Sequence, residues 1–416
     1  MSNTDNSMMV NLERMLRDLD EVNSFSTDFH GNADGITRRS FTDEDTKARS
    51  WLVRKLQDVG LEVSVDGFGN VRGLLPGEGK IVVTGSHLDT IPNGGPYDGI
   101  LGVISALEAI RVIKERNLSV THPIELVAFT DEEERFMSFL GSYAYTGDLD
   151  ANLVRTLADS DGIPLQECMH KQGFDPDTAT HTSKVDLDRI EAFVELHVEQ
   201  GPLLEMKGID IGVVDTVKGN YRYAITIAGK PDHAGFPMEG RSDAFLALHG
   251  LLTRILALAR VYERSGLLYT VGDVKVFPGL ENVVPGKAYC SIDLRVKDGN
   301  ILTELDRNIT SFIEEMMRDG QFTVHTEMIL KLDPVPMDER ICKAIETSAA
   351  EAGITHMRMS SGAGHDAQVL AGHVPTAMIF VPSKDGKSHR PDEYTAPEDI
   401  RKGAEVLLRT LFNLAR

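Results

Sequence analysis

The chain has 416 residues, more than one hydrophobic core usually organises, so its length predicts two domains. Hydrophobic residues make up 41% and charged residues 26% of the sequence, an ordinary balance for a globular protein. The formal net charge of −21 argues against nucleic acid or an anionic membrane as a partner. It leaves room for a small anionic substrate, because a local site can be basic in an acidic protein.

Three further features predict a cytoplasmic protein. The first ten residues are polar and lack a basic region followed by an apolar stretch, so no signal peptide is expected. No run of 18 or more apolar residues is present, so no membrane span is expected. Cys168, Cys290 and Cys342 are scattered and lack metal-ligand spacing, which is typical of reduced thiols.

The first half of the chain alternates predicted helices and buried strands. Apolar spacing predicts helices over 46–59 and 100–114, and short apolar runs predict strands over 80–85, 124–129 and 190–196. Strands that alternate with helices favour a mainly parallel sheet with helices on both faces.

The order of predicted helices and strands changes between residues 211 and 328. The predicted order there is βαββαβ, with strands over 223–228, 273–277, 289–295 and 322–328 and helices over 242–260 and 301–318. The alternation of helices and strands then resumes, with helices over 338–352 and 397–414 around a strand over 375–381. We therefore expect a discontinuous catalytic domain, residues 1–210 and 329–416, interrupted by an inserted domain over residues 211–328.

Polar residues follow the predicted strands where a parallel sheet forms its ligand crevice. His87 ends one strand, and Asp89 is placed to accept its other ring N–H and so fix the tautomer. Taken alone, this pair is equally well explained as a polar strand end. Asp98 stands among glycines directly before a helix, where capping that helix is the alternative role.

Three more polar segments follow strands or lie in the last loop. They are the acidic run 131–134, the segment 195–201 around His197, and the segment 388–393 around His389. A bare acidic run is usually a solvated loop. Three imidazoles together with at least two carboxylates at strand ends, however, suit a borderline divalent ion such as Zn²⁺, Mn²⁺ or Co²⁺.

This set of segments resembles the M20 metallopeptidase-like superfamily. Within it, the chain resembles the hydantoinase/carbamoylase branch, which comprises N-carbamoyl-L-amino acid hydrolases, β-ureidopropionases and allantoate amidohydrolases. The resemblance covers nearly the whole chain and implies an α/β fold, a zinc-peptidase-like catalytic domain with an inserted βαββαβ dimerisation domain. Besides the segments above, it is carried by the motifs at 35–38, 232–235, 241–244, 282–286 and 362–367.

The resemblance implies two divalent metal ions per chain, Zn²⁺, Mn²⁺, Co²⁺ or Ni²⁺. By motif position, His87, Asp98 and His197 would hold one ion, and Asp98, Glu133 and His389 would hold the other. Asp98 would then bridge the two ions.

Glu132 is the general base that the resemblance implies. The family pattern is Glu-Glu-Gly-x-Arg-Phe, whereas here Glu132 and Glu133 are followed directly by Glu134, Arg135 and Phe136, one residue fewer and without glycine. An alignment from the Arg-Phe pair would instead select Asp131 and Glu132. The strand end at residues 129–130 favours the pair Glu132 and Glu133.

Substrate contacts are also implied by motif position. Arg295 has the planar fork that matches a carboxylate, and Asn282 and His233 would reach the substrate from the inserted domain. Gln200 and Gly364 are further candidates. The inserted domain implies a homodimer in which His233 of one chain reaches the site of the other.

The predicted function is hydrolysis of the ureido C–N bond of an N-carbamoyl-L-amino acid or a similar ureido acid. Allantoate amidohydrolase and β-ureidopropionase are the nearest alternatives, followed by an M20 aminoacylase or dipeptidase. The loop 93–95 and the segment 199–201 favour the carbamoylase branch. A non-catalytic binding protein on this scaffold would be expected to lack Glu132 or a ligand, and all are present.

Overall fold

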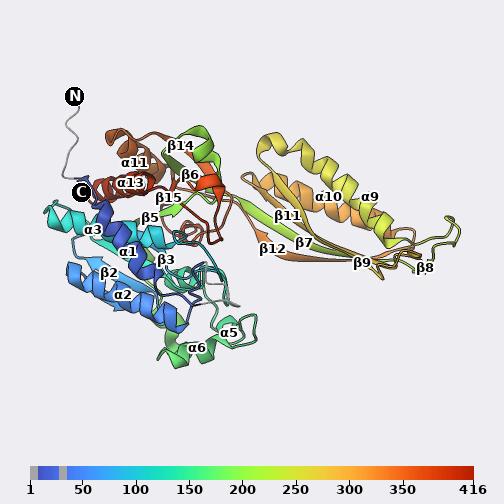
Figure 1. Cartoon of the computed structure of the whole chain (residues 1–416), viewed down its shortest axis with the longest axis horizontal. Coiled ribbons are helices and arrows are strands. Elements are labelled where there is room, and N and C mark those ends of the chain that lie inside the picture. The colour runs from blue at the N-terminus through green and yellow to red at the C-terminus, as the bar shows by residue number, and fades with distance from the viewer. Residues whose placement is uncertain (1–7, 28–34) are drawn as a thin grey trace. The chain divides into compact units, whose positions relative to one another are not determined.

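The computed structural model describes residues 8–27 and 35–416, and the chain divides into two compact units (Figure 1). Unit 1 comprises Met1–Asp215 and Pro336–Arg416, and unit 2 comprises Thr216–Val335. The insert expected over 211–328 therefore starts and ends later along the chain. The start is later because β6 (Ile211–Val217) pairs with β15 (Thr376–Val381) and so belongs to the sheet of unit 1. The end is later because β12 (Thr323–Leu332) continues the sheet of unit 2 past residue 328.

Unit 1 is built on a nine-stranded mixed sheet of order β1-β2-β4-β3-β5-β15-β6-β13, with β14 paired to β6. The central strands β4, β3, β5 and β15 run parallel to one another. The nine strands are β1 (Glu62–Val65), β2 (Val71–Leu75), β3 (Ile81–His87), β4 (Ile124–Phe129), β5 (Ile190–Val198), β6, β13 (Val335–Pro336), β14 (His356–Ser361) and β15.

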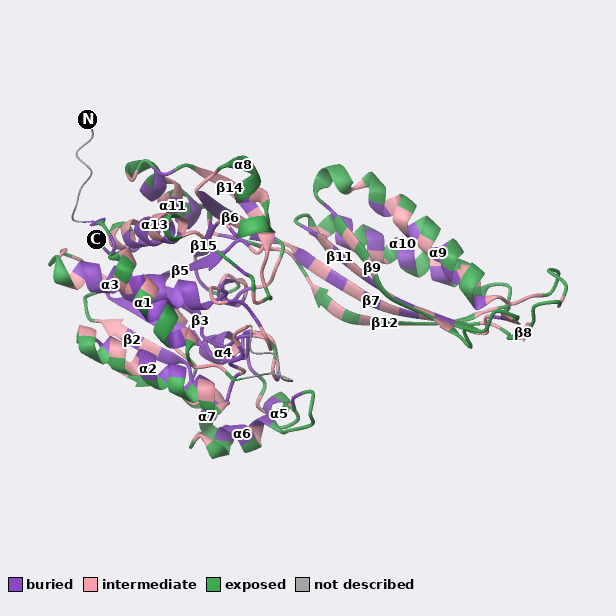
Figure 2. Ribbon diagram, in the orientation of Figure 1, coloured by how far each residue is buried: buried purple, intermediate pink, exposed green. Residues whose placement is uncertain are grey.

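Helices pack around this sheet because the central strands are apolar on both faces. Every residue of β4 and of β15 is buried, and almost every side chain of α3 is buried between β3 and α13 (Figure 2). The helices of unit 1 are α1 (Leu12–Asn23), α2 (Asp43–Val59), α3 (Ile100–Glu115), α4 (Leu140–Thr146), α5 (Ala151–Val154), α6 (Leu165–Lys171), α7 (Pro176–Thr182), α8 (Leu203–Lys207), α11 (Glu339–Glu351), α12 (Asp366–Leu370) and α13 (Pro397–Ala415).

Unit 2 is an antiparallel sheet of order β12-β7-β11-β9 with two helices packed on one face. Alternate residues of β7, from Tyr221 to Ile227, are buried against the helices, as a half-covered sheet requires. The long elements follow the expected βαββαβ order, which confirms the α/β class. They are β7 (Gly219–Ala228), α9 (Ala244–Val261), β9 (Leu268–Phe277), β11 (Lys287–Val296), α10 (Gly299–Met317) and β12 (Thr323–Leu332).

Helix α9 carries exposed apolar side chains at its two ends. One side of α9 packs into the core, but Phe245, Leu246 and Val261 are exposed (Figure 2). Among residues 8–27 and 35–416, α9 is the one helix long and apolar enough to span a membrane. A single such helix is weak support for a span, because a core helix has the same composition.

Candidate metal centre

The candidate metal ligands lie at the carboxyl ends of four neighbouring parallel strands. His87 is the last residue of β3, and His197 is the penultimate residue of β5. Glu133 follows β4, and His389 follows β15. Because β4, β3, β5 and β15 are consecutive in the sheet, these four loops meet at one edge, where parallel sheets bind ligands.

Two imidazole rings are held with Nε2 directed into the centre, where Nε2 of His197 accepts the backbone N–H of Gly99 at 3.2 Å. Nδ1 of His87 lies 2.9 Å from the carbonyl oxygen of Asp89, and Nδ1 of His197 lies 2.9 Å from that of Val198. A carbonyl only accepts, so each Nδ1 carries the proton and each Nε2 of a neutral ring presents its lone pair. Nε2 of His87 is buried and has no hydrogen-bond partner within the described residues.

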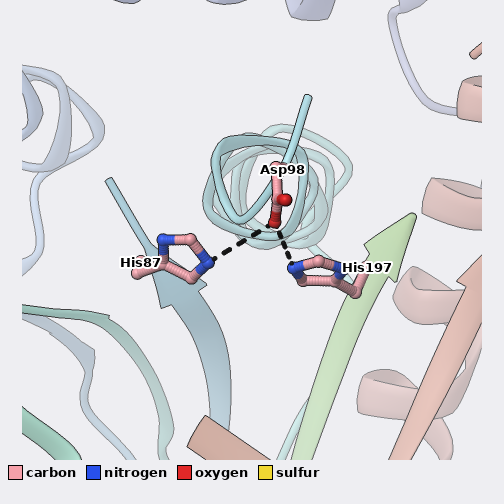
Figure 3. Close-up of side chains that lie close together, drawn as sticks. All are labelled: His87, Asp98 and His197. Carbon is pink, nitrogen blue, oxygen red and sulfur yellow. Dashed lines mark ion pairs between the residues drawn. The ribbon is translucent and has the colours of Figure 1, made fainter. Parts of the chain in front are cut away.

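The buried Asp98 carboxylate lies between these rings (Figure 3). Its Oδ1 is 3.0 Å from Nε2 of His197 and 3.8 Å from Nε2 of His87. Its Oδ2 is 3.1 Å from Nε2 of His389. The two oxygens of one carboxylate therefore face two different sets of ligands, which is what a bridging carboxylate needs.

Asp98 does not cap α3, which was its alternative role. The N-cap is Gly99, and no side chain makes a capping hydrogen bond there. Gly99 has a φ of 67°, and a Cβ added to it would lie 2.3 Å from ring atoms of His87. Glycine at this position therefore lets the chain turn beneath the imidazole and directs Asp98 toward the rings.

The carboxylates after β4 complete two overlapping groups. Glu133 Oε1 lies 3.5 Å from Nε2 of His389, and Glu132 Oε2 lies 3.7 Å from Nε2 of His87. Ligand atoms of His87, Asp98 and His197 lie within 4.8 Å of one another, and so do those of Asp98, Glu133 and His389. These two groups coincide with the ligand sets that the sequence motifs suggested, and they share Asp98. Two more groups of the described residues meet the same distance limit: His87, Glu132 and Glu133, and Glu195, His197 and His365. Imidazole and carboxylate donors in such groups suit divalent ions.

The loop after β4 favours Glu132 and Glu133 over the shifted pair. The buried Asp131 carboxylate accepts backbone N–H groups from Arg135, Phe136 and Met137 at 2.9–3.2 Å. Asp131 is therefore committed to holding the loop closed. Glu134 adopts a φ of 60° in the left-handed region, where the family pattern has glycine.

The expected role of the Asp89 carboxylate is wrong. Its Oδ1 lies 3.9 Å from Nδ1 of His87, too far for a hydrogen bond, and the Asp89 carbonyl takes that proton instead. The carboxylate accepts the backbone N–H groups of Glu132 and Glu133, at 3.4 and 3.1 Å. The chain turns after β3 so that the main chain faces the ring, and the Asp89 side chain supports the neighbouring acidic loop.

The buried carboxylates of the centre need nearby positive charge to remain ionised. Burial, followed by the charge of Glu133, raises the pKa of Glu132 well above its ordinary value. Burial and then Asp98 do the same to the pKa of Glu133. Burial opposes ionisation of Asp98, but the imidazoles of His197 and His389 hold its pKa well below the ordinary value. Two divalent cations would stabilise all three carboxylates in their charged form.

Comparisons with known proteins identify the family of the chain. The family described as peptidase family M20/M25/M40 matches residues 83–413. The chain belongs to the M20 peptidase family. An amidase of the hydantoinase/carbamoylase family from Burkholderia multivorans is similar in structure, with a TM-score of 0.88, 33% identity, and coverage of 98% of this chain and 99% of that one.

Two curated relatives place the chain in the same branch of the M20 family. Allantoate amidohydrolase from Bacillus subtilis is 36% identical over 391 residues, which cover 92% of this chain and 93% of that protein. N-carbamoyl-L-amino-acid amidohydrolase from Paenarthrobacter aurescens is 34% identical over 410 residues, which cover 97% and 98%. The hydantoinase/carbamoylase branch suggested by the sequence motifs is thereby confirmed.

The other candidate residues of this M20 protein fall into two groups. Gln200 and Gly364 lie in unit 1: the Gln200 amide donates to Asp98 Oδ2 at 2.9 Å, and Gly364 packs against the ring of Phe139. The remaining three, His233, Asn282 and Arg295, lie in unit 2.

Within unit 2, His233 and Asn282 come together but Arg295 does not join them. The short strands β8 (Asp232–His233) and β10 (Val283–Val284) pair, and the carbonyl of Asn282 accepts the N–H of Ala234 at 2.8 Å. Arg295 pairs with Asn220 near the opposite end of β11. Figure 1 shows β8 at one end of this sheet.

Sequence reasoning gave no role to two residues that the structure places beside Asp98. Ser388 Oγ lies 2.9 Å from Asp98 Oδ2, and it lies 2.6 Å from Oε2 of the buried Glu393. Both residues belong to the short segment that carries His389. That proximity is the signal that could have singled them out.

Proposed function

We propose that this M20 protein hydrolyses the ureido C–N bond of an N-carbamoyl-L-amino acid or a similar ureido acid, using two divalent ions and Glu132 as general base. The observation that carries the proposal is the pair of ligand groups sharing Asp98, with Glu132 directly beside His87. Relatives named as amidohydrolases of allantoate and of N-carbamoyl-L-amino acids support a hydrolase that acts on C–N bonds other than peptide bonds.

The residues of the centre divide the chemistry between them. His87, Asp98 and His197 would hold one ion and Asp98, Glu133 and His389 the other, and ions so held polarise a carbonyl and lower the pKa of a water. Glu132 lies next to this group without belonging to either set that shares Asp98. It would take a proton from the attacking water and pass it to the leaving nitrogen.

Selection of an acid requires a cationic group, and unit 2 offers one at Arg295. The Asp293 carboxylate accepts from Nε of Arg295 at 2.8 Å and from Nε of Arg222 at 3.2 Å. Two guanidinium groups thus share one carboxylate, and a planar guanidinium is the group best suited to bind a substrate carboxylate.

Replacing Arg295 tests this assignment. We expect Arg295→Ala to lower kcat/KM for an N-carbamoyl acid by roughly 30- to 1000-fold, or about 2–4 kcal/mol, because a charge-assisted bidentate contact is lost. Arg295→Lys should not restore it, since lysine lacks the fork. The measurement compares the acid with its carboxamide analogue, and only the preference for the acid should disappear.

The control for Arg295 is Arg307→Ala, which removes an exposed arginine from α10 of the same unit. It should leave kcat/KM unchanged. An equal loss for acid and carboxamide in Arg295→Ala would mean that Arg295 supports the sheet of unit 2 instead of recognising the substrate.

The layout of unit 2 also supports a homodimer with a shared site. Lys287 pairs with Ala228 near β8, and Arg295 pairs with Asn220 at the other end. Eight residue steps of about 3.3 Å separate these ends by roughly 26 Å, far more than the length of a small ureido acid. His233 and Arg295 of one chain therefore cannot contact one substrate together. We propose that they serve the same site from two different chains.

The surface of unit 2 is consistent with such a dimer. Strand β9 is an edge of the sheet, and its residues Leu268, Val274 and Phe277 are exposed, as are Phe245 and Leu246 of α9. An exposed edge strand that carries apolar side chains is a surface that a second copy can cover.

A mixing experiment tests the shared site. Chains with His233→Ala and chains with Glu132→Gln should each be nearly inactive, the first because a donor to the oxyanion of the tetrahedral intermediate is lost. Mixed dimers should recover part of the activity, because one of their two sites combines an intact Glu132 with an intact His233. If subunit exchange is demonstrated and no activity returns, His233 acts within its own chain or has no part in the reaction.

The function itself is tested by ammonia release. Metal-stripped protein is supplied with Zn²⁺, Mn²⁺, Co²⁺ or Ni²⁺ and incubated with an N-carbamoyl-L-amino acid, N-carbamoyl-β-alanine or allantoate. At least one ureido acid should release ammonia, and the ranking of the three identifies the substrate class. Failure with all three under every metal would refute the proposed function.

A further inference from the structure

Glu393 is a buried carboxylate that ties together two loops of the candidate metal centre. Its Oε1 accepts the backbone N–H groups of Tyr97 and Asp98, at 2.8 and 3.0 Å. Its Oε2 lies 2.6 Å from the hydroxyl of Ser388, the residue before His389. Its exposed fraction is only 3%, so these contacts replace the water that a carboxylate would otherwise bind.

The loop before Asp98 is shaped to admit this carboxylate. A Cβ added to Gly95 would lie 2.3 Å from the carboxyl carbon of Glu393 and 2.4 Å from its Oε1. No other residue type would leave room for Glu393 in this position. Gly95 thus provides a second observation, separate from the hydrogen bonds, that the two loops are fitted to each other around Glu393.

Ser388 extends the link from Glu393 to the side chain of Asp98. The Ser388 hydroxyl lies within hydrogen-bond distance of both Asp98 Oδ2 and Glu393 Oε2, but it has one proton to donate. Glu393 is therefore the acceptor that holds Ser388 in place whenever Asp98 Oδ2 is engaged elsewhere.

Asp98 and His389 need such support because each stands on an irregular segment. Asp98 lies in the turn before α3, and His389 has a φ of 57° in the left-handed region. The imidazole of His389 is also the most exposed of the three at the centre, with 48% of its side chain accessible. Its approach to Asp98 therefore depends on how the segment 388–393 is anchored.

We propose that Glu393 is a positioning residue for the metal centre. Its carboxylate holds the backbone of Asp98 and the segment carrying His389 in the arrangement that an ion between Asp98, Glu133 and His389 requires. The inference rests on the proposed function, because it assigns Glu393 to the same pair of metal sites. Glu393 itself belongs to none of the candidate ligand groups among the described residues.

The test measures Co²⁺ binding to the metal-stripped full-length protein by isothermal titration calorimetry. Glu393→Gln keeps an oxygen for the N–H groups of Tyr97 and Asp98 but places an amide NH₂, which cannot accept, toward Ser388. We expect the affinity for one of the two Co²⁺ ions, the one assigned to Asp98, Glu133 and His389, to fall about 10- to 100-fold, the usual range for partners of metal ligands. Ser388→Ala should produce a loss in the same direction.

Excess metal distinguishes positioning from general damage to the fold. Adding Co²⁺ well above the new Kd should return kcat of Glu393→Gln close to the wild-type value, because Glu132 and the substrate contacts are unchanged. The matched control is Glu398→Gln, an exposed glutamate in the first turn of α13, which should bind Co²⁺ as wild type does. Thermal unfolding of the metal-free variants checks that they fold. If Glu393→Gln does not fold, the Co²⁺ affinity of Ser388→Ala tests the proposal in its place.

Two results would overturn the proposal, and they distinguish failure of the positioning role from failure of the proposed function. If wild type binds two Co²⁺ ions and hydrolyses a ureido acid, while folded Glu393→Gln and Ser388→Ala bind Co²⁺ with unchanged affinity, the positioning role is refuted and the proposed function stands. If wild type itself binds no Co²⁺ and no ureido acid is hydrolysed, the proposed function is refuted, and the role of Glu393 falls with it.

Discussion

Glu132→Gln should lower kcat by at least about 10²- to 10⁴-fold, the usual contribution of a general base, while the protein keeps its metal ions. The amide has nearly the same shape as the carboxylate but cannot take a proton from water. Glu132 lies in neither ligand group that contains Asp98, although it forms a further group with His87 and Glu133. If Glu132 acts as the base and not as a ligand, metal content measured by elemental analysis should match wild type.

Two neighbours in the same loop give matched comparisons for Glu132. Glu134→Gln makes the same chemical change at an exposed position and should retain activity. Asp131→Asn removes an acceptor for the N–H groups of Phe136 and Met137, so it should lower thermal stability more than kcat. If Asp131→Asn were inactive and Glu132→Gln active, the base would be Asp131, and the shifted alignment would be right.

Asp98→Ala should remove both ions at once and abolish turnover. The carboxylate faces His87 and His197 with one oxygen and His389 with the other, so both groups lose a shared ligand. His389→Ala removes a ligand from only one group and should leave one ion bound. Metal content is measured after dialysis against metal-free buffer, with the exposed Asp177→Ala on α7 as control.

The contrast between these two variants tests whether the sites share a ligand. If Asp98→Ala retained one ion per chain with undiminished affinity, Asp98 would belong to a single site. If His389→Ala lost both ions, the two sites would depend on each other through something other than Asp98 alone.

The features that the sequence predicted best are those set by local pattern. The apolar run 124–129 corresponds to β4 residue for residue, and the helix expected over 100–114 is α3. His87 and His197 could be placed beside each other because each ends such a run, and parallel strands deliver their ends to one edge. The motif resemblance then supplied roles that spacing alone leaves open.

The features that the sequence could not predict depend on tertiary contacts. Strand β1 is mostly exposed, so it lacks a decisive local pattern. Strand β6 is buried, but its local pattern does not say which sheet it joins, and its pairing with β15 is what assigns it to unit 1. The contact of Glu393 with Asp98 spans 295 residues and leaves no trace in local spacing. The Asp89 carboxylate was misassigned because spacing cannot tell whether the main chain or the side chain of a residue faces a ring.

Metal-dependent selection between a ureido acid and its acyl analogue tests the central claim most directly. Metal-stripped protein, alone and with added Co²⁺ or Mn²⁺, is assayed on an N-carbamoyl-L-amino acid, the matching N-acetyl amino acid and a dipeptide. Activity should be absent without metal, return with up to two ions per chain, and be far greater on the ureido acid. Full activity without bound metal, or a preference for the acetyl compound or the dipeptide, would contradict the account.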